Sequence, residues 1–299
     1  MRHDVSHKTS HSSVLPIQTY SMKHIDVYYS PRQVSCPDSS SPSPRKPEWV
    51  VKEWLYRKLA VRVIEPVVAT RDQIALAHHP GYVDGILSCE MMNGFRGRQK
   101  EVAQSLPWTC GSFLSAARAA LDNGLVACSP TSGFHHAGWK TAYGYCTFNG
   151  LLVAAITLHG EGRVRRVGIL DCDQHYGDGT AEIIASKQLD WIRHVSKEYV
   201  DLNEADPFLS QLPEVMIGFA DCDLLMYQAG ADPHVDDPLG GFLTTEQLAR
   251  RDQIVFTLAK EMDIPVVWNL AGGYQEPFYE VLKIHNNTML ACIASYGCV

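Results

Sequence analysis

The 299-residue chain has no apolar run that approaches the roughly 18 to 20 residues needed to cross a membrane. Its first residues also carry no apolar segment of the kind that a signal peptide contains. We therefore expect a soluble protein that stays in the cytoplasm and has no membrane partner.

An excess of positive charge and a paired cysteine spacing are missing as well. Against 33 Asp and Glu there are 26 Lys and Arg, so the formal net charge is -7, which disfavours nucleic acid as a partner. The nine cysteines are scattered from Cys36 to Cys298 without a CxxC motif, and several lie inside apolar runs. This pattern is typical of buried, reduced thiols rather than of a disulfide framework.

Two parts of the chain differ in composition. Residues 1–22 are rich in His, Ser and Thr and have little apolar periodicity, so we predict a disordered leader. The whole chain is 45% hydrophobic, enough for a sizeable core, and we expect residues 23–299 to form a single catalytic domain.

Short apolar runs alternate with longer segments of helical periodicity. The predicted strands are residues 25–29, 61–64, 125–128, 167–170, 191–195, 224–228 and 264–269. The predicted helices are residues 48–59, 71–77, 113–123, 149–159, 179–186 and 244–262. Such alternation predicts an α/β fold: a single-domain, open, mostly parallel β-sheet with helices on both faces.

Potential metal ligands follow three of these strands. Asp171, Asp173 and His175 alternate along the end of the strand 167–170, so in extended backbone they can share one side. Asp232 follows the strand 224–228, and the pair His135 and His136 follows the strand 125–128. Carboxylates and imidazoles suit a catalytic zinc that keeps one position open for water, although Fe(II) and Co(II) accept the same donors. The pattern predicts a hydrolytic metal site.

The polarity of a parallel sheet separates these residues from a similar motif. Ligands gather at the carboxyl ends of parallel strands, where Tyr274 is also expected. Asp221 and Asp223 repeat the Asp-Cys-Asp motif but precede the strand 224–228. We therefore assign them to the opposite edge and give them no metal.

Several motifs together resemble the zinc-dependent histone deacetylase family of the arginase and deacetylase superfamily. They are GFHHAG (133–138), GYCTFN (144–149), DCDQHYGDGT (171–180), GAD (230–232), DPLG (237–240) and GGY (272–274). The resemblance runs from about residue 25 to about residue 297 and implies the arginase/deacetylase fold.

The resemblance implies a role for each motif. Asp173, His175 and Asp232 would bind Zn²⁺, and Tyr274 would donate its hydroxyl to the substrate carbonyl. His136 would act as general base and acid, with His135 as its electrostatic partner. Carboxylates fix both imidazoles, and the implied pairs are His135 with Asp171 and His136 with Asp178.

The resemblance also implies a structural cation and a substrate channel. A K⁺ or Na⁺ ion would be held by the Asp171 segment and by a serine one strand away, with the ligand set Asp171, Asp173, His175 and Ser196. The channel would be lined by Gly144, Tyr145 and Leu239, whereas Trp108 and Phe208 fit either the channel or ordinary packing. Cys146 and Cys172 are expected to be packing residues rather than nucleophiles.

Three positions depart from the family pattern. Ser105 aligns with a rim aspartate that binds peptide backbone, and Leu239 aligns with a glutamate of polyamine-selective relatives. The family's basic residue behind the active site maps to either Arg45 or Lys46.

The sequence thus predicts a zinc-dependent hydrolase that removes an acetyl or other short acyl group from an amine. Acyl-lysine in a protein or peptide is the leading substrate, and a small acylated amine is the alternative. A catalytically silent member that binds an acylated ligand is the rival hypothesis. The oligomeric state stays open, and a homo-oligomer is compatible with the sequence.

Overall fold

The computed structural model describes residues 22–37, 39–197 and 202–298. Apart from Met22, the predicted leader lies outside these residues. The prediction that residues 23–299 form one catalytic domain stays a prediction.

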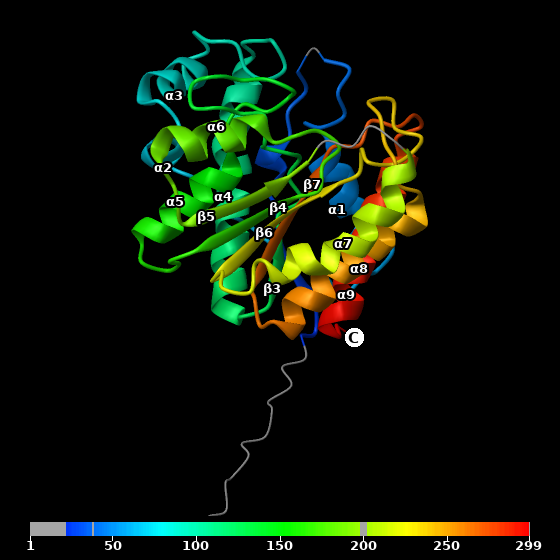
Figure 1. The fold of residues 1–299 in the computed structure, drawn as a ribbon. Helices are drawn as coiled ribbons and strands as arrows, with labels where there is room; N and C mark the ends of the chain where they lie inside the picture. Colours follow the sequence, from blue (N-terminus) through cyan, green and yellow to red (C-terminus); the bar gives the residue numbers. More distant parts are fainter. Residues whose placement is uncertain (1–21, 38, 198–201, 299) are drawn as a thin grey trace, which may run out of the picture.

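One sheet runs through the described residues, with the strand order β2-β1-β3-β7-β6-β4-β5 and only parallel pairs (Figure 1). Its strands are β1 (Ile25–Tyr28), β2 (Val61–Ile64), β3 (Val126–Cys128), β4 (Val167–Asp171), β5 (Ile192–Ser196), β6 (Leu224–Gly230) and β7 (Val266–Ala271). The predicted α/β class and parallel sheet are confirmed.

Helices cover both faces of the sheet (Figure 1). One face carries α2 (Arg71–Ala77), α3 (Pro80–Leu87), α4 (Lys100–Asn123), α5 (Gly150–Gly160) and α6 (Asp178–Lys187). The other carries α1 (Lys46–Tyr56), α7 (Ala205–Ile217), α8 (Thr245–Glu261) and α9 (Tyr279–Tyr296). Two 3₁₀ turns, Pro31–Gln33 and Leu202–Glu204, precede α1 and α7.

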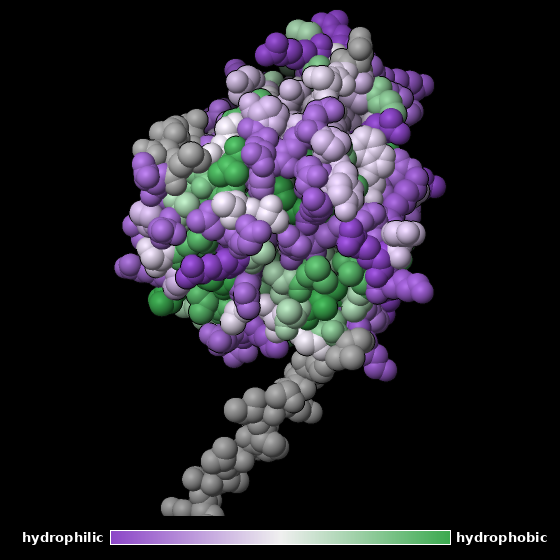
Figure 2. Space-filling view, turned by 90° about the vertical axis from the view of Figure 1, so that its right-hand side faces the viewer, coloured by the Kyte–Doolittle hydropathy of each residue, from purple (hydrophilic) through white to green (hydrophobic). Residues whose placement is uncertain are grey.

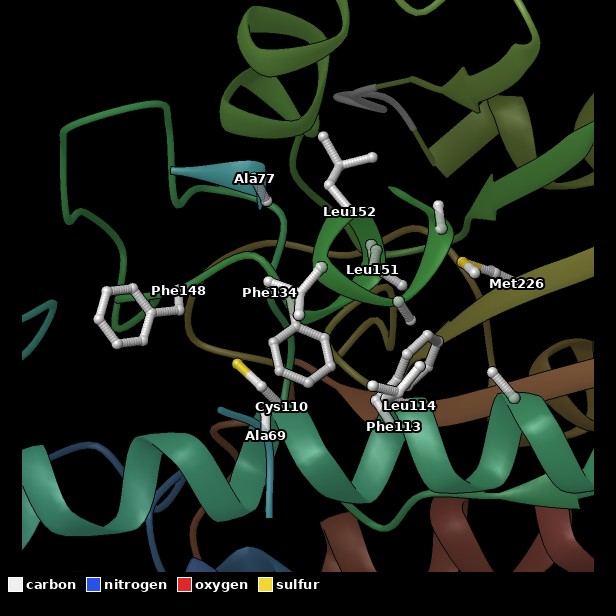
Figure 3. Close-up of a cluster of buried hydrophobic side chains, with 14 of the residues drawn as sticks. Ala69, Ala77, Cys110, Phe113, Leu114, Phe134, Phe148, Leu151, Leu152 and Met226 are labelled. Carbon is white, nitrogen blue, oxygen red and sulfur yellow. The ribbon is translucent and has the colours of Figure 1, made fainter. Parts of the chain in front are cut away.

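Strand residues alternate between two hydrophobic cores. Met226 of β6 packs on the α4 and α5 side, whereas its neighbours Leu225 and Tyr227 pack on the side of α8 and α9. In Figure 3, Phe113 and Leu114 of α4 point toward α5 and β6. Strands that are apolar on both faces in this way are typical of parallel sheets.

The sequence missed some helices. The predicted helix 113–123 is only the second half of α4, which continues through Pro107 although proline normally ends a helix. The carbonyl of Pro107 accepts a hydrogen bond from the backbone N–H of Ala69, outside the helix. Helices α3, α7 and α9 were not predicted, and α9 contains Asn286 and Thr288, which favour helices weakly but are buried here.

The surface is mostly hydrophilic, with scattered apolar areas on the face shown in Figure 2. No helix in the described part of the chain is long and apolar enough to span a membrane.

Candidate active site

The carboxyl ends of β4, β6 and β7 and the loop after β3 meet at one edge of the sheet. Asp171 pairs with Gln228, and Gln228 pairs with Asn269, so these strand ends lie side by side. A cavity of about 520 Å³ opens at this edge. The predicted site residues in its lining are His135, His136, Gly144, Tyr145, Asp173, His175, Leu239 and Tyr274.

Asp173, His175 and Asp232 form a cluster with the chemistry of a metal site. Each offers a ligand atom, and these atoms lie within 4.8 Å of one another. The Nδ1 atom of His175 is 3.2 Å from Oδ1 of Asp173 and 3.2 Å from Oδ2 of Asp232. Both carboxylates are buried, and Oδ2 of Asp232 has no partner among the described residues other than this imidazole. Because burial of two adjacent negative charges is costly, this donor set fits a divalent cation.

The same crowding changes the acidity of the two carboxyl groups. Burial, together with the neighbouring charge of Asp173, raises the pKa of Asp232 to about 7. For Asp173 burial acts in the same direction, but the positive charge of His135 and the hydrogen bonds from His175 hold its pKa below the ordinary range. The two carboxyl groups of the cluster thus differ strongly in acidity.

Gly272 and Lys46 support the cluster from behind. Gly272 has a φ of 52°, and a Cβ atom on it would collide with the carboxylate of Asp232. Its carbonyl accepts a hydrogen bond from Nζ of Lys46, a fully buried side chain whose pKa is lowered by burial to about 8. Arg45 instead stacks over Trp49 at 5.0 Å, so Lys46 is the basic residue behind the site.

The two adjacent histidines are oriented by separate carboxylates. His135 Nδ1 is 2.8 Å from Oδ2 of Asp171, and His136 Nδ1 is 2.6 Å from Oδ1 of Asp178. In each ring the contact favours Nδ1–H as the donor to the carboxylate, and in a neutral His136 this leaves Nε2 as the free base. The structure therefore brings together both pairs that the resemblance implied.

The two imidazoles differ in basicity. Burial lowers the pKa of His135, but the charges of Asp171 and Asp173 outweigh it and raise the pKa to about 9. For His136, burial and the positive charge of His135 lower the pKa. Their ring centroids are 4.1 Å apart. One ring therefore carries the charge and leaves its neighbour neutral, which is the state that a general base requires.

Phe134 fixes the backbone of the histidine pair. Its ring lies in the core, 5.5 Å from the ring of Phe113, and Figure 3 shows it pointing toward α4. Its N–H donates to Oε1 of Gln228 at 3.0 Å, and Nε2 of Gln228 donates to Oδ1 of Asp171 at 2.8 Å. Sequence reasoning missed Gln228, although its place at the end of a buried strand was a usable signal.

The residues of the predicted K⁺ or Na⁺ site also lie together. Ser196 Oγ is 3.4 Å from Oδ2 of Asp171 and accepts a hydrogen bond from the N–H of Gly177 at 2.9 Å. Among the described residues, one group of three or more His, Cys, Asp or Glu side chains is close enough together to hold an ion, and it is the triad Asp173, His175 and Asp232. The monovalent ion stays a prediction.

Aromatic side chains surround the entrance. The ring centroids of Tyr145 and Tyr274 are 5.7 Å apart, and Ser43 lines the same cavity. Gly144 has a φ of 52°, and a Cβ atom on it would strike the His136 ring, so this position keeps the imidazole in place. Ser43 lies in the proline- and serine-rich loop and was not predicted.

The expectation for Ser105 was wrong. This residue is buried in α4 and donates to the carbonyl of Val102. It lines a small hollow of about 60 Å³ that adjoins the main cavity, and it is not among the residues that line the main cavity itself. Because α4 continues through Pro107, Ser105 lies within the helix and its side chain is buried. Phe95 and Arg96, which sequence reasoning missed, line the main cavity instead.

The remaining candidates take structural places. Trp108 lies under Arg32 at 4.6 Å, and Phe208 packs on the ring of Phe242 at 5.4 Å. Asp221 forms an ion pair with Arg193 at 2.9 Å and is not among the residues that line the main cavity, in agreement with its position before β6.

Cys146 and Cys172 are also buried. Burial raises the pKa of each thiol to about 12, which keeps the sulfur protonated and poorly nucleophilic. This supports packing roles for both.

Comparisons with known proteins agree with this geometry. Residues 43–196 and 197–286 match the family model of the histone deacetylase domain. An uncharacterized protein of Picosynechococcus sp. is 28% identical over 75% of this chain and 83% of its own length. Histone deacetylase 2 of Arabidopsis thaliana is 25% identical over 74% of this chain, which spans 65% of that protein.

The fold also matches a solved structure. The acetylpolyamine aminohydrolase of Burkholderia pseudomallei superposes with a TM-score of 0.73 and 19% identity, over 91% of this chain and 99% of that one. At this identity the likeness concerns the fold.

Proposed function

Because this chain belongs to the histone deacetylase family, we propose that it hydrolyses the amide bond of an acylated amine with the aid of a bound divalent metal ion. The observation that carries the proposal is the buried Asp-His-Asp cluster beside two histidines that are each oriented by a carboxylate. Neither feature is needed for packing. Together they provide the parts that amide hydrolysis requires.

Asp173, His175 and Asp232 would hold the ion, with Zn²⁺ the proposed metal. Such an ion supplies Lewis-acid polarisation of an amide carbonyl and lowers the pKa of a nearby water molecule. We propose K⁺ or Na⁺ as a second, structural ion beside Asp171 and Ser196.

Side chains of this protein would transfer the protons and stabilise the negative charge that develops during hydrolysis. His136, kept neutral by its lowered pKa, takes the proton of the attacking water at Nε2 and returns it to the departing amine. The hydroxyl of Tyr274 donates to the amide oxygen as negative charge develops there. Asp178 holds the tautomer of His136 throughout.

The leading substrate is the acylated side chain of lysine, because the cavity brings the apolar and aromatic side chains of Tyr145 and Leu239 together with the histidine pair, which suits a methylene chain that ends in an amide. A small acylated amine is the alternative. It is favoured by the lining near Phe95 and Arg96, where the described residues supply no carboxylate to accept hydrogen bonds from a peptide backbone.

The test is release of acetate and longer acyl groups from acyl-lysine peptides and small acylamines by the zinc-loaded protein. Tyr274→Phe and His136→Ala should each lose at least ~10²-fold in kcat while retaining the metal. Tyr279→Phe is the matched control, because Tyr279 is exposed on α9. Metal-loaded protein that turns over no substrate would support a ligand-binding role instead.

A further inference from the structure

A second hollow adjoins the main cavity. It has a volume of about 470 Å³ and shares with the main cavity the residues Ser39, Ser40, Tyr145, Leu239 and Tyr274. A molecule whose acyl group reaches the histidine pair can therefore extend into this hollow without leaving the protein. We call this space the side hollow.

Aromatic rings form an apolar wall of the side hollow. The rings of Trp49 on α1 and Phe278 before α9 have centroids 4.8 Å apart and are tilted by 56°. Pro42 and Pro238 add further apolar surface. Such a wall suits the methylene chain of a small molecule, whose polar end must then meet polar groups.

Two opposite charges line the same space. The guanidinium of Arg45 lies 5.0 Å over the ring of Trp49, and Glu276 lies on the segment that leads to Phe278. Within the part of the chain that the structure describes, neither Arg45 nor Glu276 forms an ion pair or a side-chain hydrogen bond. By contrast, Lys52 on α1 and Arg57 directly after it both pair with carboxylates of that helix.

A ligand that satisfies both groups must carry a carboxylate for Arg45 and an ammonium for Glu276. A polyamine would leave Arg45 unmatched. An internal residue of a polypeptide has neither charge, since its α-amino and α-carboxyl groups are in peptide bonds. A free amino acid has both charges on one carbon.

We propose that the side hollow binds the zwitterionic end of a free amino acid whose acylated side-chain amine lies in the main cavity. Nε-acyl-lysine and its shorter-chain analogues have this chemistry. The inference rests on the proposed hydrolase function and narrows its substrate to the small-molecule class. Arg45 would bind the carboxylate, Glu276 the ammonium, and the Trp49 and Phe278 rings the methylenes.

The experiment compares kcat/KM on matched acetamides. Nε-acetyl-lysine carries both charges, ε-acetamidohexanoate only the carboxylate, and N-acetylcadaverine only the ammonium. Arg45→Gln should lower kcat/KM on the two carboxylate-bearing substrates about tenfold more than on N-acetylcadaverine, since it removes one charged hydrogen-bond donor. Glu276→Gln should lower it about tenfold more on the two ammonium-bearing substrates than on ε-acetamidohexanoate.

Arg165→Gln and Glu261→Gln are matched controls, because both residues are exposed and lie outside both hollows. Equal losses on all three substrates would overturn the inference, and so would a wild-type preference for an acetyl-lysine peptide with blocked termini. Either result would leave the hydrolase function standing. Absence of turnover on the acetamides and the peptide alike would remove both proposals.

Discussion

Nζ of Lys46 donates a hydrogen bond to the carbonyl of Gly272, which joins the start of α1 to the segment that carries Tyr274. Gly272 also lies against the carboxylate of Asp232. A single buried ammonium group therefore fixes a backbone turn that borders both the metal cluster and the proposed hydroxyl donor. This makes Lys46 a positioning residue.

Replacement of Lys46 by Met should disturb that turn. The Gly272 carbonyl would lose its buried donor at a cost of ~1 to 3 kcal/mol in the free energy of unfolding, and kcat would fall because Tyr274 is displaced. Lys46→Arg should restore most of the activity because it also donates. Urea denaturation and steady-state kinetics measure both effects, with Lys52→Met, on the exposed side of α1, as control. Unchanged kcat in Lys46→Met would contradict the positioning role.

The activity should extend to acidic pH. Burial and the charge of His135 lower the pKa of His136 from the ordinary value of 6.5, so the neutral base persists as the pH falls. The acidic limb of the kcat/KM profile should therefore lie below pH 6.5. Because Asp178 acts to raise the pKa of His136, Asp178→Asn should move this limb to still lower pH while kcat drops. A shift to higher pH in that variant would rule out His136 as the titrating base.

The sequence predicted the sheet and the site better than the helices. The central strands β4, β6 and β7 are mostly apolar, and each carries a polar residue at or near its carboxyl end, namely Asp171, Gln228 and Asn269. The place of these residues follows from the polarity of a parallel sheet. The roles of Asp173, His175 and Asp232 came from their order among several motifs, and the structure brings the three together.

What the sequence could not predict depends on tertiary contacts. Pro107 lies inside α4 because packing outweighs its local cost, so Ser105 turned inward and not to the rim. Ser43 reaches the site from a loop without periodicity, and Lys46 from the first position of α1, two residues before the predicted start of that helix. Both residues are far from Tyr274 in sequence, so no local pattern could predict that they lie beside it.

Removal of the metal should destabilise the protein, because an ion that binds only the folded state at about 1,000 times its Kd contributes roughly 4 kcal/mol. Asp232→Asn should change the Tm in opposite directions in the metal-free and the metal-bound protein. Without metal the variant should have the higher Tm, since it removes one of two adjacent buried carboxylates, whose burial and mutual repulsion raise the pKa of Asp232 to about 7. With metal it should have the lower Tm. Thermal unfolding with and without chelator measures both, and Asp221→Asn, at an exposed ion pair, should change neither by much.

Arg251 should matter to the metal cluster although it lies behind it. Its fully buried guanidinium donates from Nη1 to the carbonyls of Gly230 at 2.8 Å and Cys172 at 3.2 Å, and these carbonyls precede Asp232 and Asp173. Asp252 balances its charge from the same helix. Arg251 thus holds together the strand ends that carry two of the proposed ligands.

Arg251→Met should therefore weaken metal binding as well as folding. The two carbonyls would lose a shared donor and Asp252 would be left as a buried unpaired charge, a loss of ~3 to 5 kcal/mol in unfolding free energy. The double variant Arg251→Met with Asp252→Leu removes that charge and should recover stability but not metal affinity. Arg250→Met, at the exposed neighbour on α8, should affect neither. Calorimetric zinc titration decides the matter: wild-type affinity in the double variant would limit Arg251 to a role in folding.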